Sequence, residues 1–155
     1  MNTKLILIFF LIIFLTSSCS YQKMNSIDQK RFDIQEFEVT GEARESFVLQ
    51  KKIQRFSNKN SPNKIKILID LSKSKTIKEK NIQNKVIKYN LSLSANIKIV
   101  ELTTNREIKR NLTFSEVYNV SDSYSITINN SKEANNSLVD KMVNEILDQL
   151  RIYYS

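Results

Sequence analysis

The stretch "IKYNLSLSANIKIV" (Ile87 to Val100) alternates apolar and polar residues without a break. One face would carry Ile87, Tyr89, Leu91, Leu93, Ala95, Ile97 and Ile99. A period of two is typical of a β-strand with one buried and one solvated face, as in antiparallel sheets. At about 3.3 Å per residue this strand would span roughly 40 Å, longer than an average strand. The chain must therefore place it in a sheet and cover one face.

Three other segments have strand patterns. "KIKILIDLS", which begins at Lys64, alternates in the same way, and "IKRNLTFSEVYNV" (Ile108 to Val120) follows a turn at residues 103–107. The inward residues of that later strand are expected to be Leu112, Phe114, Tyr118 and Val120. Residues 31–40 alternate at first but shift parity between Ile34 and Phe37. This shift predicts a strand with a β-bulge.

Two segments have the apolar spacing of helices. Residues 42–56 follow Gly41, with acidic residues early and basic residues late, which suits a helix dipole. In residues 132–154 apolar side chains recur every fourth position, at Ala134, Leu138, Met142, Ile146 and Leu150. Ser131 is the expected N-cap of this second helix. The polar residues 121–131 would extend the sheet or wrap around it.

The order of these elements is β-α-β-β-β-α. This order predicts an α+β fold: a two-layer sandwich of about four mainly antiparallel strands, with two helices packed on one face.

The N-terminus has the features of an export signal. Lys4 precedes the apolar run "LILIFFLIIFL", which is too short to cross a bilayer comfortably, and small residues lead to Cys19. The order Leu15-Thr16-Ser17-Ser18-Cys19 resembles the bacterial lipobox, which implies that Cys19 is the lipidation site. We therefore expect a signal peptide at 1–18, a lipidated tether at 19–30 and a single domain at 31–155. An uncleaved membrane anchor is the alternative.

Composition excludes many kinds of catalytic site. The chain has no histidine, one glycine, one proline and one cysteine. It therefore lacks Ser-His and Cys-His nucleophilic sites, histidine-ligated zinc and glycine-rich phosphate loops. Its carboxylates are scattered among lysines, with no evident acid/base pair. We expect no enzymatic activity, no cofactor and no metal.

The formal net charge is +8, and many of the basic residues flank two turns. The abundant anions at a bacterial envelope are lipid phosphates, so we expect no nucleic-acid partner for an exported lipoprotein. Candidate contacts to such phosphates are Lys73, Lys75, Lys78, Lys80, Lys85 and Lys88 around the first turn, and Arg106, Lys109 and Arg110 around the second. The alternative for both groups is an ordinary solvated surface.

Three stretches together resemble the lipopolysaccharide-assembly lipoprotein family (LptE, alphaproteobacterial type). They are the lipobox at Cys19 with Tyr21, the strand "YNLSLSANIKI" followed by "REIKRNLTFSEVYNV", and the closing helix "EANNSLVDKMVNEILDQL".

This resemblance implies a two-layer domain that is anchored to the outer membrane by lipid and faces the periplasm. The domain would plug a large LptD-like β-barrel translocon, support its assembly and bind lipopolysaccharide during delivery. Two other functions stay open: an accessory lipoprotein of an envelope lipid-transport ATPase, and a plain structural tether.

Overall fold

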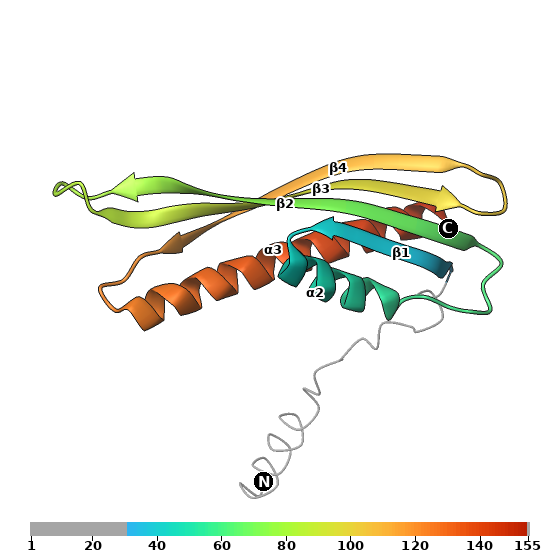
Figure 1. The fold of residues 1–155 in the computed structure, drawn as a ribbon, viewed down its shortest axis with the longest axis horizontal. Coiled ribbons are helices and arrows are strands. Elements are labelled where there is room, and N and C mark those ends of the chain that lie inside the picture. Colours follow the sequence, from blue (N-terminus) through green and yellow to red (C-terminus); the bar gives the residue numbers. More distant parts are fainter. Residues whose placement is uncertain (1–30, 155) are drawn as a thin grey trace, which may run out of the picture.

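The computed structural model describes residues 31–154 and shows two layers, a sheet and a pair of helices (Figure 1). The cysteine at position 19 and the proposed tether lie outside the described residues. The elements are β1 (Asp33–Gly41), α2 (Ala43–Gln54), β2 (Lys64–Lys80), β3 (Val86–Glu101), β4 (Glu107–Asn119) and α3 (Tyr124–Tyr153). No helix in this part of the chain is both long enough and apolar enough to span a membrane.

The sheet has the strand order β1-β2-β3-β4. β2, β3 and β4 pair antiparallel through short turns. β1 pairs parallel with β2 because α2 carries the chain back to the same end of the sheet. Both helices pack on one face, so the predicted α+β two-layer fold is confirmed.

The core lies between the sheet and the helices, on the face that the alternation predicted. From Leu91 to Ile99, every second residue of β3 is buried. Ile65, Ile67, Ile69 and Leu71 line the same face on β2. Across the layer, the four-residue repeat of α3 supplies Leu138, Met142, Ile146 and Leu150, all almost fully buried. Burying these large side chains contributes about 1.5–3 kcal/mol each, which makes the layer contact the main source of stability.

β1 is irregular at its start and ends at the chain's only glycine. Its register with β2 shifts between Ile34 and Glu36, which confirms the bulge predicted from the parity shift. Gly41 has φ = +92°, a conformation that other residues rarely adopt. This backbone turns the chain from the strand into α2 within two residues.

Two segment assignments from the sequence are wrong. Residues 72–80, whose lysines were expected around the first turn, continue β2 and pair with β3 as far as Val86. Their sequence lacks an apolar alternation because every residue from Ser72 to Lys80 is exposed, so this part of the ribbon adds no side chain to the core. Residues 124–131, interpreted as extending or wrapping the sheet, form the first two turns of α3, so Ser131 lies inside the helix and is not its N-cap. Tyr124 and Ile126 are exposed there, so their alternation does not reflect burial.

α3 crosses the sheet diagonally (Figure 1). Near its middle, the Ser137 hydroxyl donates a hydrogen bond to Glu116 on β4 (2.8 Å). At its C-terminal end, Tyr154 packs against Phe32, which precedes β1, with ring centroids 6.3 Å apart. The helix therefore lies beside the C-terminal half of β4, and its last residues reach both Phe32 and Arg106, the residue before β4.

Candidate functional site

The predicted basic residues lie at two opposite ends of the sheet. Lys73 to Lys88 follow the β2–β3 ribbon toward its turn, whereas Arg106, Lys109 and Arg110 surround the β3–β4 turn. β3 connects the two turns and has 16 residues, which at about 3.3 Å per residue places them roughly 50 Å apart. The residues around the two turns therefore cannot bind the same head group, although Lys73, opposite Leu93, and Arg110, opposite Ile97, are only four residues apart along β3.

Lys73 is held on the inner face of the ribbon. Its ammonium lies 2.7 Å from Glu45 and 3.4 Å from Glu42, at the start of α2. Glu45 is only 3% exposed. Lys73 thus joins the ribbon to α2, an interaction that the sequence did not indicate because the partners are 28 residues apart.

The contact between Lys73 and Glu45 shifts the pKa of both side chains. Burial raises the pKa of Glu45, but the hydrogen bond and the charge of Lys73 outweigh burial and hold that pKa below its ordinary value of 4.5. Burial lowers the pKa of Lys73, but the hydrogen bond and charge of Glu45, with Glu42, raise it above 10.5. The ion pair therefore persists across the neutral range.

The low pKa of Glu45 predicts an acid-sensitive contribution to stability. Because the pKa is lower in the folded than in the unfolded chain, this contribution is complete above the unfolded value and is lost as pH falls through the folded value. Glu45→Gln should therefore flatten the decline in unfolding free energy below about pH 4.5. Urea unfolding at several pH values from 3 to 6 measures this decline in unfolding free energy. The exposed Glu38→Gln should keep the wild-type slope, and a wild-type slope in Glu45→Gln would contradict the prediction.

Lys75 lies over two tyrosines on the same inner face. Its Nζ is 3.8 Å from the ring centroid of Tyr89 and 5.6 Å from that of Tyr118. The rings themselves pack with centroids 5.7 Å apart. Cation–π attraction orders this ammonium while leaving it able to contact an anion.

The remaining lysines of the ribbon surround the β2–β3 turn. Lys85 pairs with Asp122 at 2.6 Å and Lys88 with Glu79 at 2.6 Å, while Lys80 donates to the side chain of Asn84 at 3.0 Å. Lys78 is exposed at an irregularity in the β2–β3 register. Lys78 and Lys80 form no ion pair within residues 31–154.

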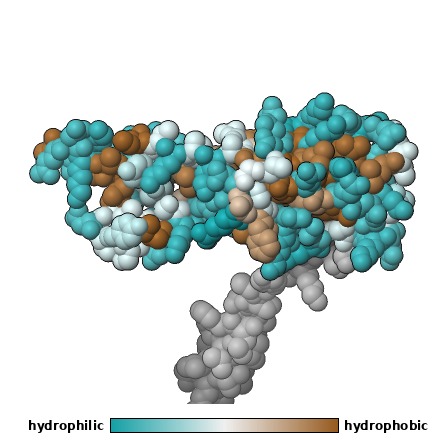
Figure 2. All heavy atoms as spheres, in the orientation of Figure 1, coloured by the Kyte–Doolittle hydropathy of each residue, from teal (hydrophilic) through white to brown (hydrophobic). Residues whose placement is uncertain are grey.

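Exposed apolar side chains accompany these lysines. Ile82, in the turn, is fully exposed and Ile77 on β2 is half-exposed. Figure 2 shows apolar residues interspersed with hydrophilic ones at this end of the molecule. We call residues 77–85 the ribbon tip. Its combination of cations and exposed isoleucines suits a ligand with both phosphates and acyl chains.

A polar pocket of about 430 Å³ lies where the ribbon meets the helices. Lys73 and Lys75 line it from the sheet, Arg44 from α2 and Lys132 from α3. Glu42 and Glu45 balance part of this charge. Arg44 and Lys132 could not be identified from the sequence, because they come from helices distant in sequence from the ribbon.

The basic group at the other end is more dispersed. Arg106 lies over the ring of Tyr153, 5.4 Å from its centroid. Lys109 lies 3.6 Å from Glu107. Arg110 is exposed and donates a hydrogen bond to the carbonyl oxygen of Lys109 at 3.0 Å. These three side chains do not line a common cavity with the ribbon lysines.

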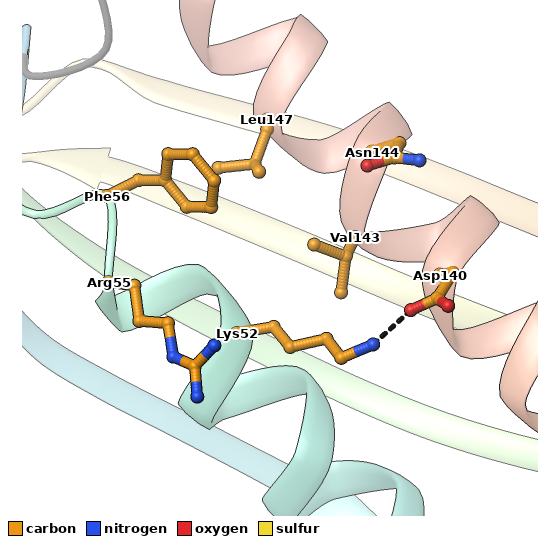
Figure 3. Close-up of a pocket in the computed structure, with 7 residues that line it drawn as sticks. All are labelled: Lys52, Arg55, Phe56, Asp140, Val143, Asn144 and Leu147. Atoms are coloured by element: carbon orange, nitrogen blue, oxygen red, sulfur yellow. Dashed lines mark hydrogen bonds and ion pairs between the residues drawn. The ribbon is translucent and has the colours of Figure 1, made fainter. Parts of the chain in front are cut away.

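A second depression separates α2 from α3 (Figure 3). It has a volume of about 520 Å³, and Phe56, Val143 and Leu147 supply its apolar wall. Lys52 of α2 reaches across it to an ion pair with Asp140 of α3 (Figure 3). The depression could not be predicted from the sequence, because it depends on how the two helices lie relative to each other.

Within residues 31–154, no three Asp, Glu or Cys side chains come close enough to hold a metal ion. The buried carboxylate of Glu45 is committed to Lys73. The arrangement is suited to binding charged and apolar groups.

Comparison with known proteins identifies the fold. No protein-family model and no curated protein matches the sequence. Among solved structures, a protein from Caulobacter crescentus described as a lipoprotein shares 13% identity, over 83% of this chain and 91% of that one, with a TM-score of 0.56.

Two further structures are similar. Rare lipoprotein B from Shewanella oneidensis shares 9% identity over 76% of this chain and 89% of its own, with a TM-score of 0.52. A protein from Nitrosomonas europaea described as lipoprotein B shares 15% identity over 82% and 87%, with a TM-score of 0.58. The chain thus has a fold found in bacterial proteins described as lipoproteins.

Proposed function

We propose that this chain is a lipid-anchored outer-membrane protein that faces the periplasm, plugs an LptD-like β-barrel translocon, supports its assembly and binds lipopolysaccharide. The observation that carries the binding role is the ribbon tip, where lysines flank exposed isoleucines. The lipobox at Cys19 and the fold shared with proteins described as lipoproteins support the anchoring. The sequence resemblance to the LptE family supplies the barrel partner.

The side chains of the ribbon tip match the chemical groups of lipopolysaccharide. Lipopolysaccharide presents phosphates next to acyl chains, and Lys78 and Lys80 would contact the phosphates as mobile charges. Ile77 and Ile82 would contact the adjoining chains. The polar pocket below the ribbon, with Lys75 at its wall, would receive further anionic groups.

The size of the domain also fits a barrel interior. A compact domain of this length has a radius of gyration of roughly 14 Å, and the β2–β3 ribbon makes this one more elongated (Figure 1). Only the widest barrels have a lumen large enough for such a plug.

Cys19→Ala should abolish the lipid anchor. Without the thiol no acyl chain can attach, and two or more chains are needed for stable membrane binding. The measurement is labelling of the full chain with a radioactive fatty acid, followed by fractionation of the envelope. We expect the wild type labelled in the outer membrane and the variant unlabelled. A wild-type chain that is unlabelled and soluble in the periplasm would contradict the anchor and the location.

Charge reversal at the tip should weaken lipopolysaccharide binding. We expect Lys78→Glu with Lys80→Glu to lower affinity about tenfold, because each exposed contact contributes only about 0.5–1 kcal/mol. Binding should also weaken as salt rises. The measurement uses the full chain in detergent, titrated with lipopolysaccharide at several salt concentrations.

The matched control for this titration is Lys109→Glu with Arg110→Glu, which changes the net charge equally at the opposite end. It should bind with nearly wild-type affinity. Equal losses in the two variants would show that only net charge matters. Unchanged affinity in a folded tip variant would return the tip lysines to an ordinary solvated surface.

Copurification tests the partner. Isolation of the full chain from membranes should recover a 1:1 complex with an outer-membrane barrel. Recovery of an inner-membrane ATPase transporter would favour the accessory-lipoprotein function, and recovery of neither would favour a structural tether.

A further inference from the structure

We propose that two copies of this chain pair through the outer edge of β4, antiparallel about a two-fold axis at Thr113, to form one continuous sheet. This inference rests on the edge of the sheet and not on the ribbon tip, and it concerns the chain when it is not inside a barrel.

β4 is an unprotected sheet edge. It is the last strand in the sheet, and its pairing with β3 runs from Glu107 to Asn119 without a register shift. Its outward N–H and C=O groups therefore form a long, regular row. Between Asn111 and Tyr118 the only charged residue is Glu116, and the segment contains no lysine or proline. Such an edge favours pairing with another strand.

The other free edges in the described sheet carry features that oppose pairing. β1 is short, has a bulge after Ile34 and presents Glu36 and Glu38. β2 beyond Leu71 has no β1 partner, but it carries four lysines and register shifts around Glu79. Lysines and bulges on an edge are common protection against pairing. β4 lacks these protections over its central residues.

The sequence of β4 is complementary to itself in one register. Centred on Thr113, antiparallel pairing places Arg110 opposite Glu116 of the partner copy, and Leu112 opposite the partner's Phe114. Ile108 then faces the partner's Tyr118. Every pair on the inner face is thus apolar with apolar or positive with negative, which stabilises cross-strand contacts.

The neighbouring registers are poorer. Centring on Leu112 places Ile108 opposite Glu116, and centring on Phe114 places Leu112 opposite Glu116. Each leaves a carboxylate against an apolar side chain. The choice of Thr113 as the centre is therefore determined by both charge and apolar matching.

In a single copy of the chain, the side chains of β4 that would meet in the pair are available for contacts with a second copy. Arg110 forms no ion pair within residues 31–154. Leu112 and Phe114 are only half-buried, although they face the helix layer. Two-fold pairing would cover both and give Arg110 a carboxylate. Glu116 would keep its contacts with Ser137 and Lys141, since a carboxylate accepts several hydrogen bonds.

The diagonal course of α3 determines which part of each helix lies near the partner strand. The helix lies beside Glu116 in the C-terminal half of β4 and departs toward Phe32. In the paired arrangement this half faces the N-terminal half of the partner strand, where the partner's helix contributes Tyr153, beside Arg106 just before the start of the strand. The middle of one helix therefore lies toward the last turn of the other.

Cysteine cross-linking tests both the pairing and its register. The full chain carrying Cys19→Ser, in detergent, provides a background without cysteine. Thr113→Cys should give a disulfide-linked dimer on mild oxidation, because opposed residues of an antiparallel pair have Cα atoms about 4.5–5.5 Å apart. Asn111→Cys and Ser115→Cys, alone, should stay monomeric. Mixed together, they should form a heterodimer.

A second set of variants tests the charge pair without a thiol. Arg110→Glu would face Glu116 of the partner and should raise the dimer dissociation constant at least tenfold by analytical ultracentrifugation. Lys109→Glu, which faces Val117, is the matched control and should change it little.

Three outcomes would overturn the proposal. The first is a monomeric wild type at all concentrations with no Thr113→Cys dimer. The second is self-linking of Asn111→Cys, which would show another register. The third is cross-linking of Thr113→Cys, in cells, only to a chain of different mass, which would assign the edge to another protein.

Discussion

Ile67→Asp is expected to unfold the domain or to leave it barely stable. Ile67 on β2 is fully buried, between Phe37 and Ile99 on the neighbouring strands. A carboxylate there would lose its hydration without gaining a cation, and it would leave part of the isoleucine volume empty. The expected loss in unfolding free energy is about 4 kcal/mol or more, a large fraction of the stability of a domain this size.

The matched control for this change is Leu68→Asp. Leu68 is the next residue of the same strand, lies on the opposite face and is partly exposed. Its carboxylate would remain hydrated, so the loss should stay near 1 kcal/mol or below. Urea unfolding followed by circular dichroism measures both variants. Equal losses would show that the helices cover the sheet less completely than the structure indicates.

Gly41→Ala should be nearly as damaging, although it adds a single methyl group. An added Cβ would lie 1.9 Å from the carbonyl oxygen of Leu71 on β2. That oxygen belongs to a strand and cannot move without disturbing the β1–β2 pairing. The φ of +92° adds strain of its own. We expect a loss of about 3 kcal/mol or more in unfolding free energy.

Asn105→Ala separates the two causes of this loss. Asn105 also has a positive φ, of 56°, but it is exposed in the β3–β4 turn. Only backbone strain applies there, so the expected loss is about 1–2 kcal/mol. The same denaturation experiment serves both variants. A Gly41→Ala chain no less stable than Asn105→Ala would mean that the close approach to Leu71 is relieved at little cost.

The lysines of the ribbon differ from one another in ways that the sequence does not predict. The sequence places Lys73 and Lys75 around the turn between two strands and treats them like Lys78 and Lys80. In the structure Lys73 is bound to Glu45 and Lys75 lies over Tyr89. Both partners come from other elements, so no local pattern could separate anchored lysines from free ones.

Local periodicity alone determined most of the architecture. The alternation around Leu93 and the four-residue repeat through Leu138 identify the faces that meet in the core, because burial imposes the period of each element. The parity shift after Ile34 likewise locates the bulge. These features depend only on residues that are close together within one segment, so they can be predicted from a single sequence.

Only the tertiary structure decided the features that depend on what lies next to each element. Residues 72–80 form a strand because β3 supplies their hydrogen bonds, and residues 124–131 are helical although no burial pattern marks them. The parallel placement of β1 leaves β4 as a free edge of the sheet. Hydrogen-bond partners and exposed edges arise from contacts between distant segments. Such contacts have no period along the chain, so the sequence by itself could not show them.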